Sequence, residues 1–164
     1  MLTACLGPNL SDYASNTPKF DIRKHLNGDL EAWGGFFSFS GKADPLLYVK
    51  MTGTWQGNDG TLSEEFKYSD GRTQHREWKI HFIDDTNFTA TASDVVGTAK
   101  GRQEGNAVNM KYVLTVKTKE GKSYNLSMDD WLYLVDDNHI INRNTMHKFG
   151  IKVGELIMGF KKVK

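Results

Sequence analysis

Two arginines stand where they could recognise a polar group of a bound molecule. Arg76 begins an alternating apolar run, and Arg143 lies two positions after an isoleucine. A guanidinium binds a carboxylate or phosphate through two parallel hydrogen bonds, so either arginine could hold such a head group. Alternatively, either could lie at the rim of the fold, stacked on an aromatic ring with its charge in water. In an enzyme, Asp130 and Tyr133 would complete a polar site with these arginines.

No catalytic pair or metal cluster stands out. Asp129 and Asp130 are adjacent, so they would face opposite sides of a strand, whereas a glycosidase pair needs carboxyls about 5–10 Å apart. We interpret them as a turn that enters a strand. The five histidines lack a metal-binding spacing such as His-Glu-x-x-His, and we expect them at the surface. We therefore predict no metal, no cofactor and no catalytic residue, and an enzyme is the less favoured class.

The aromatic side chains are a second group with a possible role in binding. Aromatic residues make up 12% of the chain, four of them tryptophans, and they could line an apolar pocket. The alternative is that the rings only fill the core, because small barrels often have no cavity. The candidate ligand-binding residues are Trp55, Arg76, Trp78, Trp131, Tyr133 and Arg143.

The elements that must position these side chains are strands. Apolar residues alternate with polar ones over residues 76–82, and most clearly over residues 108–116. Short turns rich in Asp, Asn and Gly separate such runs, which is typical of antiparallel hairpins. About nine or ten strands in meander order must close into a barrel or split into two sheets. We predict an all-β, antiparallel up-and-down barrel with a short N-terminal helix over about residues 21–26; the alternative is a β-sandwich.

Composition sets the wider limits. The chain has 164 residues, 38% of them hydrophobic and 25% charged, as expected of one globular domain. A net charge of +1 argues against a nucleic-acid partner. No stretch approaches the ~20 apolar residues of a transmembrane helix. We expect a truncated signal, lipobox and tether over residues 1–19 and a single barrel domain over residues 20–164.

The single cysteine has a distinctive neighbourhood. Residues 2–5 (LTAC) resemble a bacterial lipobox, in which the cysteine receives a diacylglyceryl lipid, and a polar spacer follows over residues 9–19. The charged and apolar regions of a signal peptide are missing, so we expect the chain to begin inside the signal sequence. Cys5 is the predicted lipidation site. Leu6, rather than Asp, follows it, which resembles the outer-membrane default, with the protein facing the periplasm.

Seven blocks of sequence resemble an uncharacterised family of small Gram-negative lipoproteins, domain of unknown function three-eight-three-three. The blocks are residues 26–34, 51–57, 94–97, 105–107, 129–134, 141–143 and 148–155. The resemblance covers about residues 10–162 and implies a lipocalin-like fold. Gly53-Thr54-Trp55 also resembles the lipocalin Gly-x-Trp motif, whose tryptophan packs under a late arginine, here Arg143.

The resemblance also implies a function. Members of the family often lie in gene neighbourhoods with fatty-acid-modifying enzymes. We therefore expect a lipid-anchored protein that binds or carries a fatty acid or another hydrophobic ligand at the cell envelope, attached to the membrane through Cys5. The alternatives are an enzyme that acts on an acyl lipid inside the barrel and a structural accessory of an envelope complex.

Overall fold

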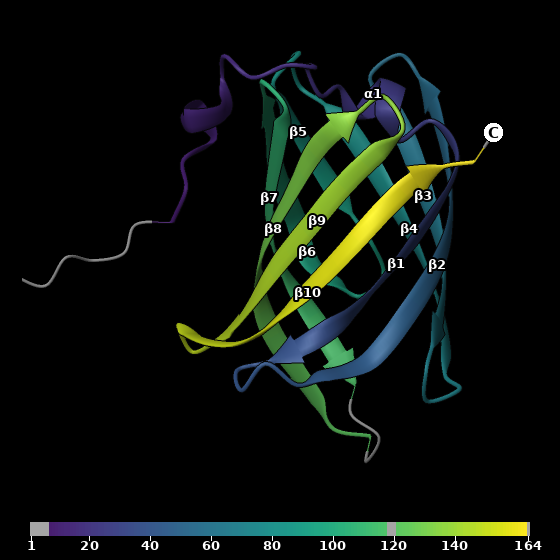
Figure 1. Cartoon of the computed structure of the whole chain (residues 1–164), viewed down its shortest axis with the longest axis vertical. Coiled ribbons are helices and arrows are strands. Elements are labelled where there is room, and N and C mark those ends of the chain that lie inside the picture. Colours follow the sequence, from purple (N-terminus) through teal and green to yellow (C-terminus); the bar gives the residue numbers. More distant parts are fainter. Residues whose placement is uncertain (1–6, 118–120, 164) are drawn as a thin grey trace, which may run out of the picture.

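The computed structural model describes residues 7–117 and 121–163, and its strands form a closed antiparallel barrel (Figure 1). Each strand pairs with its neighbours in the sequence, and β1 closes the barrel by pairing with β10. The predicted up-and-down barrel is confirmed, and the sandwich is not formed. The strands are β1 (Gly28–Ser38), β2 (Ala43–Gln56), β3 (Asp59–Tyr68), β4 (Thr73–Phe82), β5 (Asn87–Thr91), β6 (Val95–Glu104), β7 (Ala107–Lys117), β8 (Ser123–Asp136), β9 (His139–Lys148) and β10 (Ile151–Lys162).

The barrel closes because each strand has one face that must leave water. On β4, Trp78, Ile80 and Phe82 are buried while the intervening residues are exposed, as the alternation predicts. Glycine makes room for large rings on this inner surface. A Cβ on Gly60 would lie 2.4 Å from the ring of Trp55, its partner across β2 and β3. Such cross-strand ring–glycine pairs hold the aromatic side chains inside the barrel.

A single helical turn, α1 (Ile22–His25), lies across the upper end of the barrel in Figure 1. The side chain of Asp21 caps it by accepting a hydrogen bond of 3.0 Å from the backbone N–H of Arg23. Ile22 and Leu26 are buried in the barrel core. The short helix expected over residues 21–26 is therefore one four-residue turn, anchored by packing rather than by its own length.

His25 contradicts the expectation that the histidines lie at the surface. Its side chain is only 2% exposed, because the ring packs edge-on against Phe20 and lies 2.8 Å from the carbonyl oxygen of Asp21. Asp137, from the turn between β8 and β9, lies 3.4 Å from its other ring nitrogen. This histidine therefore closes the α1 end of the barrel as a hydrogen-bonded core residue.

The segment before α1 is an ordered arm on the outside of the barrel. It contains a short 3-10 turn, η1 (Leu10–Tyr13). The arm is held to the turn between β6 and β7, where the backbone N–H of Phe20 donates to the carbonyl oxygen of Gly105 over 2.7 Å. Neither helix of the described residues has the length and apolar character that a membrane-spanning helix requires.

Candidate functional site

A cavity of about 90 Å³ lies inside the barrel and brings a polar cluster against apolar walls. The apolar walls come from α1 and from the inner faces of the strands. They include Ile22, Leu26, Leu62, Phe66, Trp78, Ile80, Phe88, Val108, Met110, Leu132, Leu156, Met158 and Phe160. The polar cluster at the cavity consists of Glu64, Arg76, Tyr112, Asp130, Asn142 and Asn144.

Arg76 is the one cation of this cluster, and its charge is already matched within the protein. Its Nε and Nη2 atoms donate to the carboxylate of Asp94 over 2.7–3.0 Å, and Nη1 donates to Glu64, its cross-strand partner, over 3.5 Å. The guanidinium also stacks on the rings of Phe66 and Trp78, 5.1 and 5.9 Å from their centroids. Burial alone would lower the pKa of Arg76, but Glu64 and Asp94 raise it above its usual value.

Asp130 is the second charged centre of the cavity. Its carboxylate accepts hydrogen bonds from the hydroxyl of Tyr112 at 3.2 Å and from the side-chain amide of Asn142 at 2.5 Å. Burial in the barrel raises its pKa to about 7, although these two hydrogen bonds act in the opposite direction. Burial also raises the pKa of Glu64, against the opposing effect of Arg76. The cluster therefore holds carboxyl groups that are costly to ionise.

One polar atom of the cluster has no hydrogen-bond partner. Asn144 is only 2% exposed, and its Nδ2 atom donates to the hydroxyl of Tyr112 over 2.8 Å. Its Oδ1 atom is one of two buried side-chain polar atoms of the described residues that have no hydrogen-bond partner; the other is Nε1 of Trp55. A buried acceptor without a donor costs free energy, and Asn144 lines the cavity, so its side chain indicates a place for a ligand group or a water molecule.

Comparison with known proteins adds the family. A family model described as protein of unknown function (DUF3833) matches residues 1–162. The chain belongs to the DUF3833 family. No curated protein matches it. Among solved structures, the S-type phycobiliprotein lyase CPES from Guillardia theta is similar, with a TM-score of 0.63 and 6% identity over 87% of this chain and 91% of that chain. A redesigned β-barrel, b11L5F_LGL, has a TM-score of 0.47 and 12% identity over 87% and 96% of the two chains.

The similarity to the lyase shows a shared fold: the DUF3833 chain forms a lipocalin-like barrel. This confirms the family and the fold that the sequence blocks imply. Cys5, the predicted lipidation site, lies outside the described residues.

Three of the six predicted ligand-binding residues of the DUF3833 barrel face its interior. Trp78 and Arg76 lie at the cavity. Trp55 lies inside the barrel toward the α1 end, with its ring 6.0 Å from that of Phe82. Arg76 is stacked on aromatic rings, as one interpretation predicted, but its guanidinium is buried among carboxylates rather than placed in water.

Trp131 and Tyr133 lie on the outer face of β8, away from the cavity. Their rings stack 5.9 Å apart, and Tyr13 of η1 packs on them at 5.8 and 5.4 Å. Trp131 is buried by the N-terminal arm and not by a ligand pocket. The apolar outer face of this strand is therefore explained by contact with η1.

Arg143 does not pack under Trp55 or line the interior. Its side chain is 53% exposed on the outer face of β9, where it donates to Glu155 of β10 over 2.5–3.0 Å. Its neighbour Asn142 is the inward-facing residue. The turn expected at Asp129 and Asp130 is also wrong, because both lie within β8.

The sequence did not indicate five members or supporters of the cluster: Glu64, Asp94, Tyr112, Asn142 and Asn144. A signal existed for some of them. Tyr112 shares the period-two phase of the buried residue Val108, and Glu64 shares that of the buried residues Leu62 and Phe66. Asp94 could not be found in this way, because it lies outside the strands, in a turn that folds back to Arg76.

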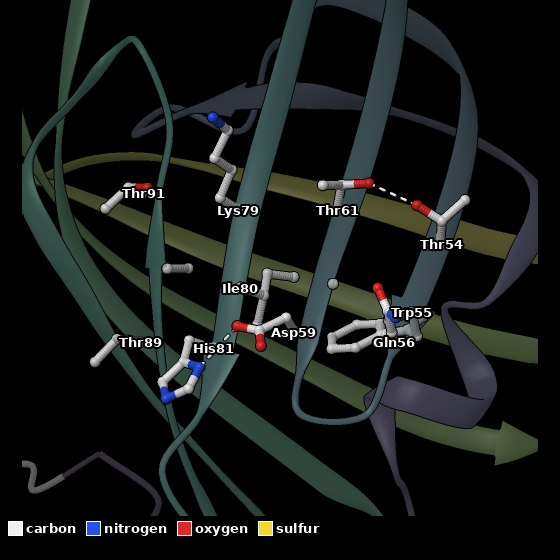
Figure 2. Close-up of a pocket in the computed structure, with 12 residues that line it drawn as sticks. Thr54, Trp55, Gln56, Asp59, Thr61, Lys79, Ile80, His81, Thr89 and Thr91 are labelled. Atoms are coloured by element: carbon white, nitrogen blue, oxygen red, sulfur yellow. Dashed lines mark hydrogen bonds and ion pairs between the residues drawn. The ribbon is translucent and has the colours of Figure 1, made fainter.

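A larger hollow of about 810 Å³ lies over β2–β5 (Figure 2). Its polar side chains pair between neighbouring strands and remain in water: the hydroxyls of Thr54 and Thr61 lie 2.7 Å apart, and His81 lies 2.8 Å from Asp59. Both members of the His81 pair are more than half exposed. Exposed pairs of this kind contribute little and converge on no common point. The interior cavity is therefore the better candidate site.

Proposed function

We propose that this barrel binds one hydrophobic small molecule in its interior and carries it at the cell envelope. The observation that carries this proposal is the cavity inside the barrel, which joins apolar walls to a polar cluster with an unpartnered acceptor at Asn144. Apolar surface with a few convergent polar groups is typical of small-molecule sites. The lipocalin-like fold supports the same function, because barrels of this size can hold one small ligand.

The size of the cavity limits how a ligand enters. Its volume of about 90 Å³ is well below the ~300–1,000 Å³ of typical ligand pockets. A compact group fits as the cavity stands, whereas a longer chain, such as that of a fatty acid, requires wall residues to move. Met110 and Met158 line the cavity, and the flexible methionine side chain can adopt other rotamers at low cost. We propose that the polar end of the ligand lies at the cluster and its apolar part displaces these side chains.

Native mass spectrometry of protein purified from its host tests the proposal directly, with a bound hydrophobic molecule as the expected result. Met110→Trp and Leu132→Trp fill the cavity and should reduce the bound fraction. The matched control is Ile141→Trp, because Ile141 is 49% exposed on the outer face of β9. Protein that is always empty, or cavity variants that retain as much ligand as the control, would contradict the proposal.

The envelope location rests on the N-terminal sequence. We propose that Cys5 is lipidated and that the protein lies at the outer membrane, facing the periplasm. Growth with radiolabelled palmitate should label the wild-type protein and leave Cys5→Ser unlabelled. Equal labelling of both proteins, or of neither, would refute the anchor while leaving ligand binding untouched.

A second candidate function is catalysis by proton transfer inside the barrel. The observation that favours it is Asp130, a carboxyl with a pKa near 7 that lies at the cavity beside Tyr112. Of the polar groups first considered for an enzyme, Arg76 and Asp130 face the cavity, whereas Tyr133 and Arg143 lie outside. Asp130→Asn separates the two functions, because lost turnover of the bound molecule with retained binding would favour catalysis.

A further inference from the structure

The polar cluster also indicates which kind of polar group its ligand carries, an inference that rests on the proposed function. We propose that the cavity selects a ligand whose polar end donates hydrogen bonds, a hydroxyl or a protonated amine, and discriminates against an ionised carboxylate. Three features of the cluster support this selectivity: its charge, its hydrogen-bond capacity and the unpartnered acceptor of Asn144.

The charge of the cluster is the first feature. Arg76 faces three carboxyl groups, those of Glu64, Asp94 and Asp130. All three nitrogens of its guanidinium already donate to Asp94 or Glu64. An anionic head group would therefore meet a cation that is already paired and would bring a negative charge next to carboxyl groups in a buried site. Burial of such an uncompensated charge is strongly unfavourable.

The second feature is the number of free donors and acceptors. Both amide protons of Asn142 are used, one by Asp130 and one by the carbonyl oxygen of Trp131 at 2.9 Å. The hydroxyl of Tyr112 donates to Asp130 and accepts from Asn144. The donors of Asn142 and Tyr112 are thus already engaged, and the cluster atom that has no hydrogen-bond partner is an acceptor, the Oδ1 atom of Asn144.

Asn144 supplies the third feature. Its Oδ1 atom is buried and without a partner, while the Nδ2 atom of the same amide is fixed by Tyr112. The assignment of oxygen and nitrogen is consistent, because a flipped amide would place its oxygen against the hydroxyl that already donates to Asp130. A ligand hydroxyl or ammonium at this position would satisfy the acceptor, whereas a carboxylate would place oxygen against oxygen.

Three probes with the same alkyl chain test the selectivity: hexanol, hexylamine and hexanoate. Tryptophan fluorescence would follow each titration at about pH 8, where a free carboxylate is ionised and a free amine largely protonated. We expect hexanol or hexylamine to bind at least about tenfold more tightly than hexanoate. Tighter binding of hexanol would indicate a neutral donor, and tighter binding of hexylamine would indicate a cation. Equal binding of all three, or preference for hexanoate, would overturn the inference but leave the proposed function intact; binding of none would count against the proposed function itself.

Two variants address the groups that carry the inference. Asn144→Leu removes the unpartnered acceptor and should weaken hexanol binding by about tenfold or more, whereas Asn125→Leu, on an exposed site of β8, should not. Because Asn144→Leu could impair folding, Asp130→Asn gives a second readout of the opposite kind. Removal of one negative charge should improve hexanoate binding relative to hexanol. An unchanged ratio in Asp130→Asn would contradict the role of charge.

Discussion

The buried carboxyl of Asp130 makes a quantitative prediction about stability against pH. Its pKa is about 7 in the folded barrel and has an ordinary value of 3.8. Below the lower pKa both the folded and the unfolded state hold the proton, so Asp130 causes no change of the free energy of unfolding with pH. Between the two values the folded state alone keeps the proton, and stability falls as pH rises. Each unit between the two pKa values is equivalent to about 1.4 kcal/mol. The free energy of unfolding therefore falls by about 4 kcal/mol in all once the pH exceeds 7.

Asp130→Asn removes this fall of stability with pH, but it disrupts one hydrogen bond. The amide keeps the size of the carboxyl, but one of its two partners, Tyr112 or Asn142, must now face an NH₂ group instead of an oxygen. A mismatched hydrogen bond costs about 1 kcal/mol. We therefore expect the variant to be slightly less stable than the wild type near pH 4 and more stable, by up to about 3 kcal/mol, near pH 8.

Urea unfolding, followed by tryptophan fluorescence at a series of pH values, measures the difference between the two proteins. Use of the difference reduces the contribution of Glu64, whose pKa burial also raises and whose charge acts on Asp130. Asp129→Asn is the matched control, because this neighbouring carboxylate lies on the outer face of β8 and accepts from Asn109 over 2.7 Å. If the wild type and Asp130→Asn keep a constant difference from pH 4 to pH 8, the assignment of a proton to Asp130 near neutrality is refuted.

Three further predictions concern stability, each measured by urea unfolding. Tyr13→Ala removes two ring contacts with β8 and should cost about 1–3 kcal/mol and expose the arm to protease; an unchanged midpoint would argue against η1 as a clasp. Gly105→Ala should destabilise more than Gly121→Ala, because both have positive φ but only at Gly105 would a Cβ meet the backbone of Tyr13, at 1.7 Å. Arg76→Met should cost about 3–5 kcal/mol and Arg143→Met less than about 1, and equal losses would contradict the difference in burial.

The barrel was predictable because each strand repeats one physical signal, a buried face with period two. On β4 this signal placed Arg76 and Trp78 on the inner surface before any pairing was known. On β9 it failed, because Ile140 and Ile141 supply one apolar residue to each face. The sequence then offered no reason to place Asn142 inside and Arg143 outside. The closed barrel determines which residues of β9 face inward, because Asn142 can donate to Asp130 only from the inner face.

Contacts distant in sequence explain the remaining differences. Trp131 and Tyr133 belong to an outer face, yet they are apolar because the N-terminal arm covers them more than a hundred positions away in the sequence. Asp94 follows the short strand β5, and the antiparallel pairing of β4 with β5 brings it to Arg76. Neither contact leaves a periodic trace, so spacing alone could not have revealed them.

The polar cluster is more than the fold requires. Buried ion pairs can often be replaced by apolar side chains without loss of stability, and most of the other buried residues of this barrel are already apolar. Local conflicts with the rules of folding are expected at functional sites. The alternative is that the cluster fixes the register of the strands. Leucine at Asp130, Asn142 and Asn144 together separates the two roles: loss of a unique fold would favour register, whereas a folded barrel that no longer binds a donor ligand would favour a binding site.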